Sequence, residues 1–457
     1  MKARLALVSM LAVACGRAPS APVSVNGTAS ATTTTTTTIE LVETPPVETT
    51  LDHPDVANAS PTWVAMIDRA QRSLDFAEFY ASEPEPKDHA DSLLTPVIVA
   101  IERAAARGVK VRFLADSAFA PKYPDTLERL RRAGAVVRIL DFGKRGGGIL
   151  HAKYFVVDGA ESFVGSQNFD WRALAHIQEM GVRVTSPVIA GALLELLDTD
   201  WELAAGAAAE TRVHHAHIAS VHASSGEDVQ LTATPRGWLP DESSWELPKL
   251  VALLDEARHA VDVQVLTYKT KERDGSPFPT LDDALRRAAA RGVHVRLLVS
   301  DWSSKPGSDA RQVLDDLAKV ANVEVRVITI PKYSGGDIPF ARVAHAKYMV
   351  VDGASGANAH AWVGTSNWEG DYFTKSRNVG VIVAGGKLPA RLDAIFEDGW
   401  SGAYAKPLGA TAVTAVTAVT PSAPEAPRSR TRSGAGEAEA WSWLRIGLLP
   451  SEDHRAP

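Results

Sequence analysis

The sequence predicts an α/β protein built from two similar lobes, because runs that pair a helix with a strand occur twice in the chain. Residues 100–114, AIERAAARGVKVRFL, return at residues 284–298 as ALRRAAARGVHVRLL, and a second pair of similar runs begins at residues 67 and 254. In each run a helix-forming stretch ends at a glycine suited to a C-cap, and β-branched residues typical of a strand follow. Alternation of helices and strands is typical of α/β folds.

A second repeat carries the polar residues of interest. The phrases HAKYFVVD at residues 151–158 and HAKYMVVD at residues 345–352 differ at one position, and the turns GSQN and GTSN follow them. Their short apolar runs predict buried strands. The repeats place two fused lobes at residues 58–212 and 230–405, with a connector at residues 213–229. We expect each lobe to be a mixed β-sheet flanked by helices, and the lobes to be related by a pseudo-twofold axis with one active site at their interface.

The two ends of the chain differ in composition from the lobes. Residues 1–15 are predicted to be a secretory signal, since two cations precede an apolar run too short to span a bilayer. Cys15, the only cysteine, follows small residues as in a bacterial lipoprotein signal and is the candidate lipid attachment site; a plain signal peptide is the alternative. We therefore expect an exported protein, tethered to the outer membrane or cell surface and facing the periplasm or the exterior. Residues 16–57 and 406–457 are predicted to be a Thr/Pro-rich disordered linker and a low-complexity tail.

The charge of the chain limits the kind of partner it can bind. The formal net charge is −7, whereas a protein that binds nucleic acid broadly along its surface is usually positive. An enzyme that concentrates its positive charge in one cleft is compatible with this value. Because the duplication supplies both halves of the site within one chain, catalysis requires no obligate protein partner.

The duplicated histidines and lysines suit chemistry on a phosphodiester. Residues i and i+2 of a strand point to the same face, so His151 and Lys153 can reach one phosphate. His345 and Lys347 can reach the same phosphate from the other lobe. Such a site supplies a nucleophile, an acid for the leaving oxygen and cations for the charged oxygens. The turns would add neutral phosphate-binding donors, namely Ser166, Asn168, Thr365 and Asn367.

Other residues near the motifs have two interpretations each. Asp158 and Asp352 end their strands, so they are supporting residues that organise the turns. A group of aromatic residues could stack the bases of a single strand or could pack in the core: Phe169, Trp171, Trp368 and Phe278. Lysine does not fit a hard-metal cage and no carboxylate cluster accompanies the pairs, so we expect neither a metal nor another cofactor.

Both motifs resemble the H-x-K-x4-D signature of the phospholipase D superfamily. This resemblance implies two phospholipase D-like lobes and a phosphohistidine intermediate formed without a metal. The runs GSQNFDWRALAHIQEMGV and GTSNWEGDYF are similar to the branch of lysosomal 5′-to-3′ single-strand exonucleases. Two departures concern the substrate: the chain cannot make the disulfides of the animal members, and the longer loop at residues 354–361 is expected to alter the rim of the cleft.

The resemblance favours a 5′-to-3′ exonuclease acting on single-stranded DNA or RNA. A phospholipid hydrolase or phosphatidyltransferase is the first alternative, and a membrane location would suit it. A non-enzymatic phosphate-binding protein is the second alternative, which conflicts with the intact motif residues.

The supporting carboxylate of the family suggests different roles for the two histidines. Glu179 begins the strand EMGVRV, 28 residues after His151, whereas the corresponding strand NVGVIV begins with Asn378. A carboxylate that holds Nδ1–H leaves Nε2 free to attack and stabilises the cation that follows. We therefore expect Glu179 to orient His151 as the nucleophile, and His345 to serve as the general acid and then the base.

Overall fold

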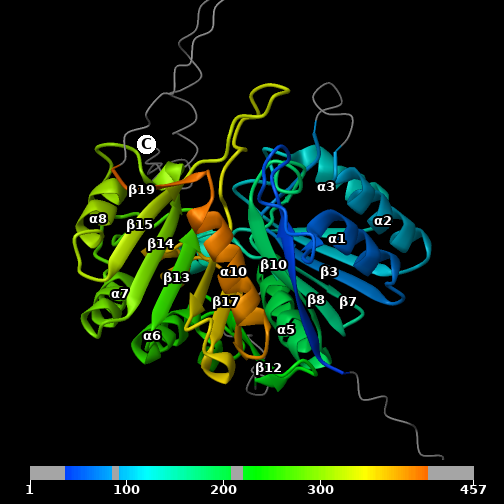
Figure 1. Cartoon of the computed structure of the whole chain (residues 1–457). Helices are drawn as coiled ribbons and strands as arrows, with labels where there is room; N and C mark the ends of the chain where they lie inside the picture. The colour runs from blue at the N-terminus through cyan, green and yellow to red at the C-terminus, as the bar shows by residue number, and fades with distance from the viewer. Residues whose placement is uncertain (1–35, 85–91, 207–219, 410–457) are drawn as a thin grey trace, which may run out of the picture. The chain divides into compact units, whose positions relative to one another are not determined.

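The computed structural model describes residues 36–84, 92–206 and 220–409, which belong to one compact unit. Two large mixed sheets form its two lobes, and helices flank both sheets (Figure 1). The α/β class and the two-lobe organisation predicted from the sequence are confirmed. Within these described ranges, no helix is both long and apolar enough to cross a membrane.

The first lobe is built on an eight-stranded sheet with the order β2-β1-β10-β8-β7-β3-β5-β6. β3, β5 and β6 are parallel to one another, and β7, β8, β10 and β1 continue the sheet with antiparallel pairs. The strands are β1 (Thr38–Thr44), β2 (Ala57–Asn58), β3 (Ser73–Glu78), β5 (Lys110–Asp116), β6 (Val136–Leu140), β7 (Lys153–Val157), β8 (Glu161–Gly165) and β10 (Glu179–Thr185). A separate pair joins β4 (Ala81–Ser82) to β9 (Phe169–Asp170).

The second lobe repeats this order in a nine-stranded sheet, β11-β12-β18-β17-β16-β13-β14-β15-β19. Its three parallel strands, β13, β14 and β15, are again followed by antiparallel ones, so β12 corresponds to β1 and β16 to β7. The strands are β11 (Val221–His222), β12 (Glu227–Ala233), β13 (Ala260–Val265), β14 (His294–Ser300), β15 (Val323–Ile328), β16 (Tyr348–Val351), β17 (His360–Gly364), β18 (Val379–Gly385) and β19 (Ala405–Pro407).

Helices cover both faces of each sheet and one pair also joins the lobes. α5 (Pro187–Ala204) packs on the first sheet and contacts β12, while α10 (Leu388–Ser401) packs on the second sheet and contacts β1 (Figure 1). The other α-helices are α1 (Ala59–Asp68), α2 (Thr95–Ala106), α3 (Pro124–Arg132), α4 (Gly143–Gly146), α6 (Glu246–Glu256), α7 (Thr280–Ala290), α8 (Asp309–Leu317) and α9 (Gly370–Thr374). Short 3₁₀ turns are Glu242–Ser244, Asp301–Ser303 and Gly356–Asn358.

The buried side chains form one core in each lobe and one core that the lobes share. The shared core lies under α5 and α10 and takes side chains from both sheets, such as Val182 and Val381. The core of the first lobe contains Trp63 and Phe76, and that of the second contains Val263 and Trp362. The shared apolar core holds the two half-sites in one fixed arrangement, because interiors are packed as densely as crystals.

The structure corrects the predicted boundaries of both lobes. The predicted disordered linker is wrong from residue 38 on, because β1 pairs with β10 along its length and buries Ile39, Leu41 and Val42. The predicted connector is wrong at its end, because β12 is the corresponding strand of the second sheet. The threonine-rich composition concealed β1, although threonine and isoleucine are good strand formers. β19 includes residues 406 and 407, which the prediction had placed in the tail; Cys15 and residues 410–457 lie outside the described residues.

Candidate active site

The two motif histidines meet where the lobes exchange backbone hydrogen bonds. His151 N–H donates to the carbonyl of Arg377 at 2.8 Å, and His345 N–H donates to the carbonyl of Gln178 at 2.8 Å. Isolated parallel bridges, Leu150 with Arg377 and Gln178 with Ala344, flank these bonds. The strand that follows each turn in one lobe therefore fixes the position of the histidine in the other lobe.

The motif lysines lie beside their own histidines, as predicted. Lys153 Nζ donates to the carbonyl of His151 at 2.6 Å, and Lys347 Nζ donates to the carbonyl of His345 at 2.5 Å. All four side chains are buried, with exposed fractions of 5% for His151, 1% for Lys153, 9% for His345 and 0% for Lys347. The structure thus brings the two imidazoles and the two ammonium groups together in one desolvated site.

The partner of each histidine comes from the opposite lobe. Glu179 of the first lobe contacts His345 Nδ1 with both carboxylate oxygens, at 2.9 and 2.8 Å. Asn378 of the second lobe contacts His151 Nδ1 through Oδ1 at 3.0 Å. The prediction that Glu179 orients His151 is therefore wrong. The physical reason is the interlobe bridge: Gln178 bonds to the backbone of His345, which brings the next residue, Glu179, to that histidine.

The hydroxyl groups of the polar turns support these partners. Ser166 Oγ donates to Glu179 at 2.5 Å, and Thr365 Oγ1 donates to Asn378 Oδ1 at 3.0 Å. A hydroxyl carries one proton, so neither side chain has a donor left for a phosphate, and their predicted phosphate-binding role is wrong. They act instead as positioning residues.

The two turn asparagines remain candidates for binding substrate. Asn168 and Asn367 are buried, with exposed fractions of 8% and 3%. Within the described part of the chain, Oδ1 of each asparagine has no hydrogen-bond partner. Buried polar atoms are almost always paired, so this matched pair suggests amide groups kept for a ligand.

The ionisation of the site follows from its burial and its lysines. Burial, with the charges of Lys153 and Lys347, holds the pKa values of both His151 and His345 well below 6.5, so their lone pairs are available at neutral pH. Burial also lowers the pKa of Lys347 to about 7 and that of Lys153 well below its usual range. Burial raises the pKa of Glu179 to about 8, against the opposing effect of Lys347 and Ser166.

Two further carboxylates near Lys153 could not be identified from the motifs. Glu78 ends β3 and Asp116 ends β5, and their exposed fractions are both 1%. Both interact electrostatically with Lys153, and burial raises the pKa of Asp116 to about 7. The matching strand ends of the second lobe are Val265 and Ser300. A comparison of the two repeats could therefore have identified both carboxylates, because the second lobe has no carboxylate at either position.

The matching aspartates of the two phrases lie at the ends of their strands away from the histidines. Asp158 accepts hydrogen bonds from the backbone of residues 71–73, and Asp352 accepts them from the backbone of residues 258–260. Each has a positive φ, 53° and 52°. Their predicted role in organising turns is confirmed. The longer loop at residues 354–361 is at this same end, next to Gly385, so the expectation that it alters the cleft rim is wrong.

Most of the predicted stacking residues belong to the cores. Phe169, Trp368 and Phe278 are buried, with exposed fractions of 0%, 1% and 7%, so the core interpretation holds for them. Trp171 is half-buried and lies edge-on to His176. A different set of rings surrounds His151: Phe79 lies 5.1 Å and Tyr372 lies 4.8 Å from its ring centroid. The motifs alone did not select these rings: Phe79 follows β3 of the first lobe, and Tyr372 lies in α9 of the second lobe, in the run GTSNWEGDYF.

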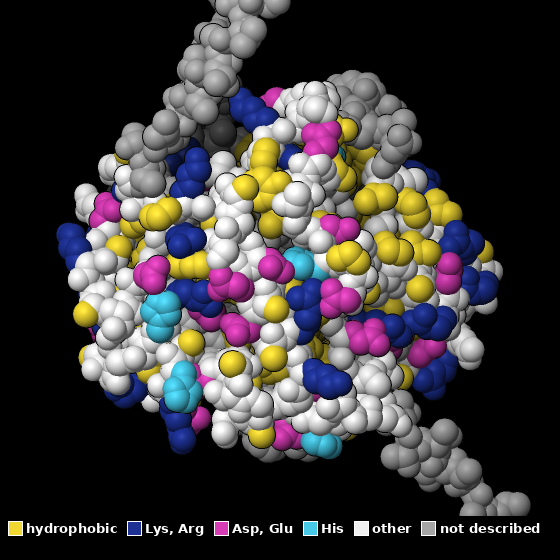
Figure 2. Space-filling view, viewed as in Figure 1, with side chains coloured by type: hydrophobic (Ala, Val, Ile, Leu, Met, Phe, Trp, Pro, Cys, Tyr) yellow, Lys and Arg dark blue, Asp and Glu magenta, His cyan; other side chains and the backbone are white. Residues whose placement is uncertain are grey.

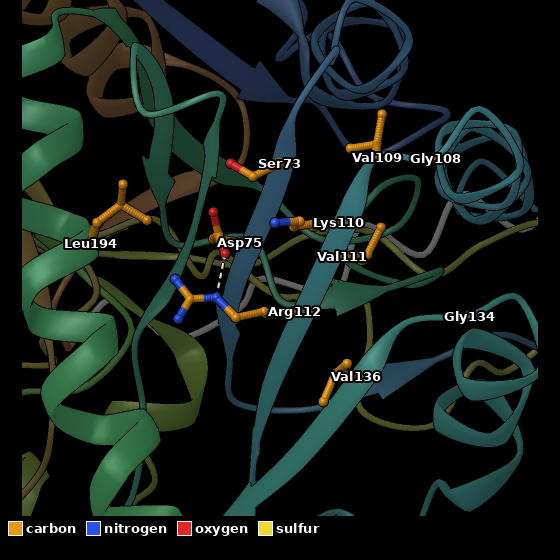
Figure 3. Close-up of a pocket in the computed structure, with 10 residues that line it drawn as sticks. All are labelled: Ser73, Asp75, Gly108, Val109, Lys110, Val111, Arg112, Gly134, Val136 and Leu194. Atoms are coloured by element: carbon orange, nitrogen blue, oxygen red, sulfur yellow. Dashed lines mark hydrogen bonds and ion pairs between the residues drawn. The ribbon is translucent and has the colours of Figure 1, made fainter.

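Neither the face shown in Figure 2 nor the open pocket of the first lobe offers a comparable site. Acidic and basic side chains are interspersed over the face shown in Figure 2, in keeping with the net negative charge. A pocket of about 640 Å³ lies by the starts of β3 and β5, where Asp75 pairs with Arg112 at 2.5 Å (Figure 3). His151 and Lys153 lie at the opposite end of the sheet, since Lys153 pairs with Glu78 at the end of β3.

Comparisons with known proteins agree with this geometry. The family model described as "Cardiolipin synthase, PLD-like domain" matches residues 63–201 and 250–400, one segment in each lobe. The chain is 31% identical over 395 residues to the 5′-3′ exonuclease PLD3 of Bos taurus, covering 79% of each chain. It is 30% identical over 382 residues to the human 5′-3′ exonuclease PLD4, covering 77% of this chain and 74% of that one.

Two further similarities concern other members and the fold. Phospholipase D Z of Dictyostelium discoideum is 30% identical over 372 residues, covering 76% of this chain and 85% of that protein. The structure of phosphatidylserine synthase from Haemophilus influenzae superposes with a TM-score of 0.53 at 12% identity, covering 76% of this chain and 85% of that one. The crossed pair of histidines and these matches together lead to one conclusion: the chain belongs to the phospholipase D family and is a phosphodiesterase.

Proposed function

We propose that this phosphodiesterase removes nucleotides from the 5′ end of single-stranded DNA or RNA, through a phosphohistidine on His345. The observation that carries the catalytic part is the crossed contact of Glu179 with His345. The support for the substrate comes from the relatives named 5′-3′ exonucleases, which are about 30% identical over most of the chain.

The contact of Glu179 gives His345 the role of nucleophile. Nδ1 of His345 is held by the carboxylate, so Nε2 carries the lone pair that attacks phosphorus. Although burial raises the pKa of Glu179, Lys347 and Lys153 favour its charged form, and so does the cationic imidazole that forms with the new P–N bond. The charged carboxylate in turn stabilises that cation. Lys153 and Lys347 are placed to hold the charged phosphate oxygens. The Nδ2 groups of Asn168 and Asn367 would add neutral donors, since their Oδ1 atoms can only accept.

His151 then serves as the proton donor and acceptor. Asn378 cannot stabilise a cationic imidazole as a carboxylate can, which suits a group that gives up its proton. A bound phosphodiester anion beside His151 favours the protonated form. As the P–O5′ bond breaks, His151 protonates the departing oxygen. Water then gives a proton to His151 and its oxygen attacks phosphorus, which breaks the P–N bond and releases a nucleoside 3′-phosphate.

Labelled oligonucleotides test this proposal directly. Purified protein in EDTA is incubated with single strands labelled at either end and, separately, with phosphatidylcholine. We expect stepwise release of nucleoside 3′-phosphates from the 5′ end and no choline. Choline release without nucleotide release would overturn the substrate, and a strict requirement for added metal would overturn the mechanism.

The intermediate has its own test. A nitrophenyl diester forms the intermediate without an acid, whereas its hydrolysis still needs His151 to activate water. With this substrate His151→Ala should accumulate the phosphoenzyme, and peptide mapping should locate the phosphate on His345. A phosphate found on the peptide that contains residue 151 in the reciprocal His345→Ala variant would reverse the two roles.

Phospholipid hydrolysis or transfer is the second candidate, because Phospholipase D Z is as similar to this chain as the exonucleases are. We also propose that the protein is exported and anchored through a lipid on Cys15, since Met1–Cys15 has the features of a lipoprotein signal. Cys15→Ala should then move the protein from the membrane fraction to the soluble fraction; an unchanged membrane fraction would contradict the anchor.

A further inference from the structure

We propose that Phe119 and Tyr123 bind the base of the nucleotide whose 5′ oxygen leaves. This inference rests on the proposed function and names the part of the substrate that the His151 side of the site recognises. It assigns a stacking site to residues outside both motifs and outside the aromatic set expected from the sequence.

An unbroken group of rings leads from His151 to these two residues. Phe79 lies 5.1 Å from His151 and 4.2 Å from Phe119, centroid to centroid. Tyr80 stacks with Phe119 at 5.5 Å and 20°, and with Tyr123 at 5.1 Å and 29°. Phe79 is 9% exposed, whereas Tyr80, Phe119 and Tyr123 are half-buried. We call these four residues the aromatic wall.

Cations accompany the half-buried rings. Lys122 Nζ lies 4.2 Å from the centroid of Phe119, and the guanidinium of Arg172 lies 5.6 Å from that of Tyr123. Lys153 Nζ lies 5.0 Å from the centroid of Phe79, at the catalytic end of the wall. Aromatic faces interleaved with cations suit single-stranded nucleic acid, in which bases alternate with phosphates.

Asp116 forms hydrogen bonds both to the loop that carries the aromatic wall and to the residue before His151. Its Oδ1 accepts the N–H of Ala118, and its Oδ2 accepts the N–H of Leu150, both at 2.8 Å. One carboxylate therefore fixes the loop that carries Phe119 and the residue that precedes His151. A base held on this loop has a set position relative to the proton donor.

The described residues of the second lobe form no comparable wall. β13 is followed by Leu266 and Thr267, where β3 is followed by Phe79 and Tyr80. Between β14 and α8 the one aromatic residue is Trp302, which packs against the aliphatic cluster of Ile177, Leu266 and Val343. The aromatic wall thus serves only the His151 side, and His151 is the group that protonates the leaving 5′ oxygen.

The test combines a change in the protein with a change in the substrate. The substrates are a single-stranded DNA oligonucleotide and the same strand with an abasic site at its second nucleotide, whose 5′ oxygen leaves in the first turnover. For the wild type we expect the abasic strand to lower kcat/KM about 5- to 150-fold, the range of one lost stacking contact. For Phe119→Ala and Tyr123→Ala we expect the ratio between the two substrates to fall towards one.

Matched variants separate stacking from a general structural effect. Phe119→Tyr should keep the wild-type ratio, whereas Phe119→Leu should lose it. Tyr404→Ala removes a half-buried ring at Tyr404, outside the wall, and should leave both the ratio and the activity unchanged.

The outcomes distinguish this inference from the proposed function. If the wild type releases nucleotides but the ratio is near one, or if Phe119→Ala and Tyr123→Ala keep the wild-type ratio, the stacking site is overturned and the exonuclease stands. A third strand, abasic at its first nucleotide, completes the set of substrates. A loss of kcat/KM with this strand alone would place the base on the other side of the site and would also overturn the stacking site. Absence of cleavage of both strands by the wild type, with choline release from phosphatidylcholine, would overturn both proposals.

Discussion

The two copies of the motif have nearly the same sequence but different surroundings. His345 is held by the carboxylate of Glu179, whereas His151 is held by the amide of Asn378. The partner comes from the opposite lobe in both cases. The comparison teaches that the chemical role of a motif histidine in this fold is determined by the other copy, because the interlobe backbone bridges decide which side chain reaches which ring.

A second difference concerns the environment beyond the hydrogen bonds. Phe79 and Tyr372 flank the ring of His151, and the buried carboxylates Glu78 and Asp116 lie in the same lobe. No such ring contact involves His345 within the described ranges. The two half-sites therefore share a backbone arrangement but differ in their side chains, in keeping with the proposal that His345 attacks phosphorus and His151 protonates the leaving group.

The largest expected effect comes from removing each histidine in turn. His345→Ala should lower kcat about 10⁴-fold or more on every diester, because no nucleophile remains. His151→Ala should lose about 10²- to 10⁴-fold on oligonucleotides, yet release one equivalent of nitrophenol from a nitrophenyl diester, because that leaving group needs no acid. Rapid-quench measurement of the burst distinguishes the two variants. A burst in His345→Ala, and none in His151→Ala, would show that His151 is the nucleophile and His345 the acid.

The second largest expected effect comes from replacing the carboxylate of Glu179. Glu179→Gln should lower the burst rate about 10³- to 10⁴-fold, since an amide cannot stabilise the cationic imidazole. Glu246→Gln is the matched control, because Glu246 is a fully buried carboxylate that bonds to Ser366, Thr232 and Trp362 rather than to a histidine. The control should stay within a few-fold of the wild type. Equal losses in the two variants would show that Glu179 acts only through folding.

The residues before Glu179 and Asn378 extend the comparison to stability. Arg377 forms a fully buried two-point ion pair with Asp200, with both N–O distances at 2.8 Å, whereas Gln178 bonds to Gln264 at 2.9 Å. Asp200→Asn should lower the free energy of unfolding by about 3–5 kcal/mol, because it leaves a buried charge unpaired. Gln264→Met should lower it by about 1–3 kcal/mol. Urea unfolding measures both changes in the free energy of unfolding. A larger loss for Gln264→Met than for Asp200→Asn would contradict the expectation that the buried ion pair matters more for stability.

Much of the fold could be predicted from the sequence because the repeats are local. The helix-to-strand runs and the twin phrases establish two α/β lobes without knowledge of any long-range contact. The strands β1 and β12, each one place in from an edge of its sheet, could not be recognised in this way. They pair with strands distant in sequence, and the threonine-rich composition before β1 is equally typical of a disordered linker.

The same distinction between local sequence patterns and long-range contacts applies to the active site. The four motif side chains could be predicted, because spacing along one strand sets the face to which each points. The partner of each histidine depends on contacts between residues 166 or more positions apart, as for Glu179 and His345. Proximity in sequence suggested His151 instead, and only the interlobe geometry corrects it.

The smallest expected effect concerns pH and tests the lysine of the second copy. The pKa of Lys347 is lowered to about 7 by burial, so its positive charge is present below pH 7 and is lost as the pH rises through that value. The pKa of His345 lies well below 6.5, so its lone pair persists on the acid side. We therefore expect kcat/KM to fall up to tenfold per pH unit above pH 7. In Lys347→Arg the fall of kcat/KM should begin at higher pH, because a guanidinium does not lose its proton near pH 7. Lys269→Arg, at a partly exposed lysine paired with Glu369, should not change the pH at which the fall begins. If kcat/KM of Lys347→Arg still falls above pH 7, another group causes the pH dependence. Lys347 would then not be one of the residues by which the two motif copies differ in function.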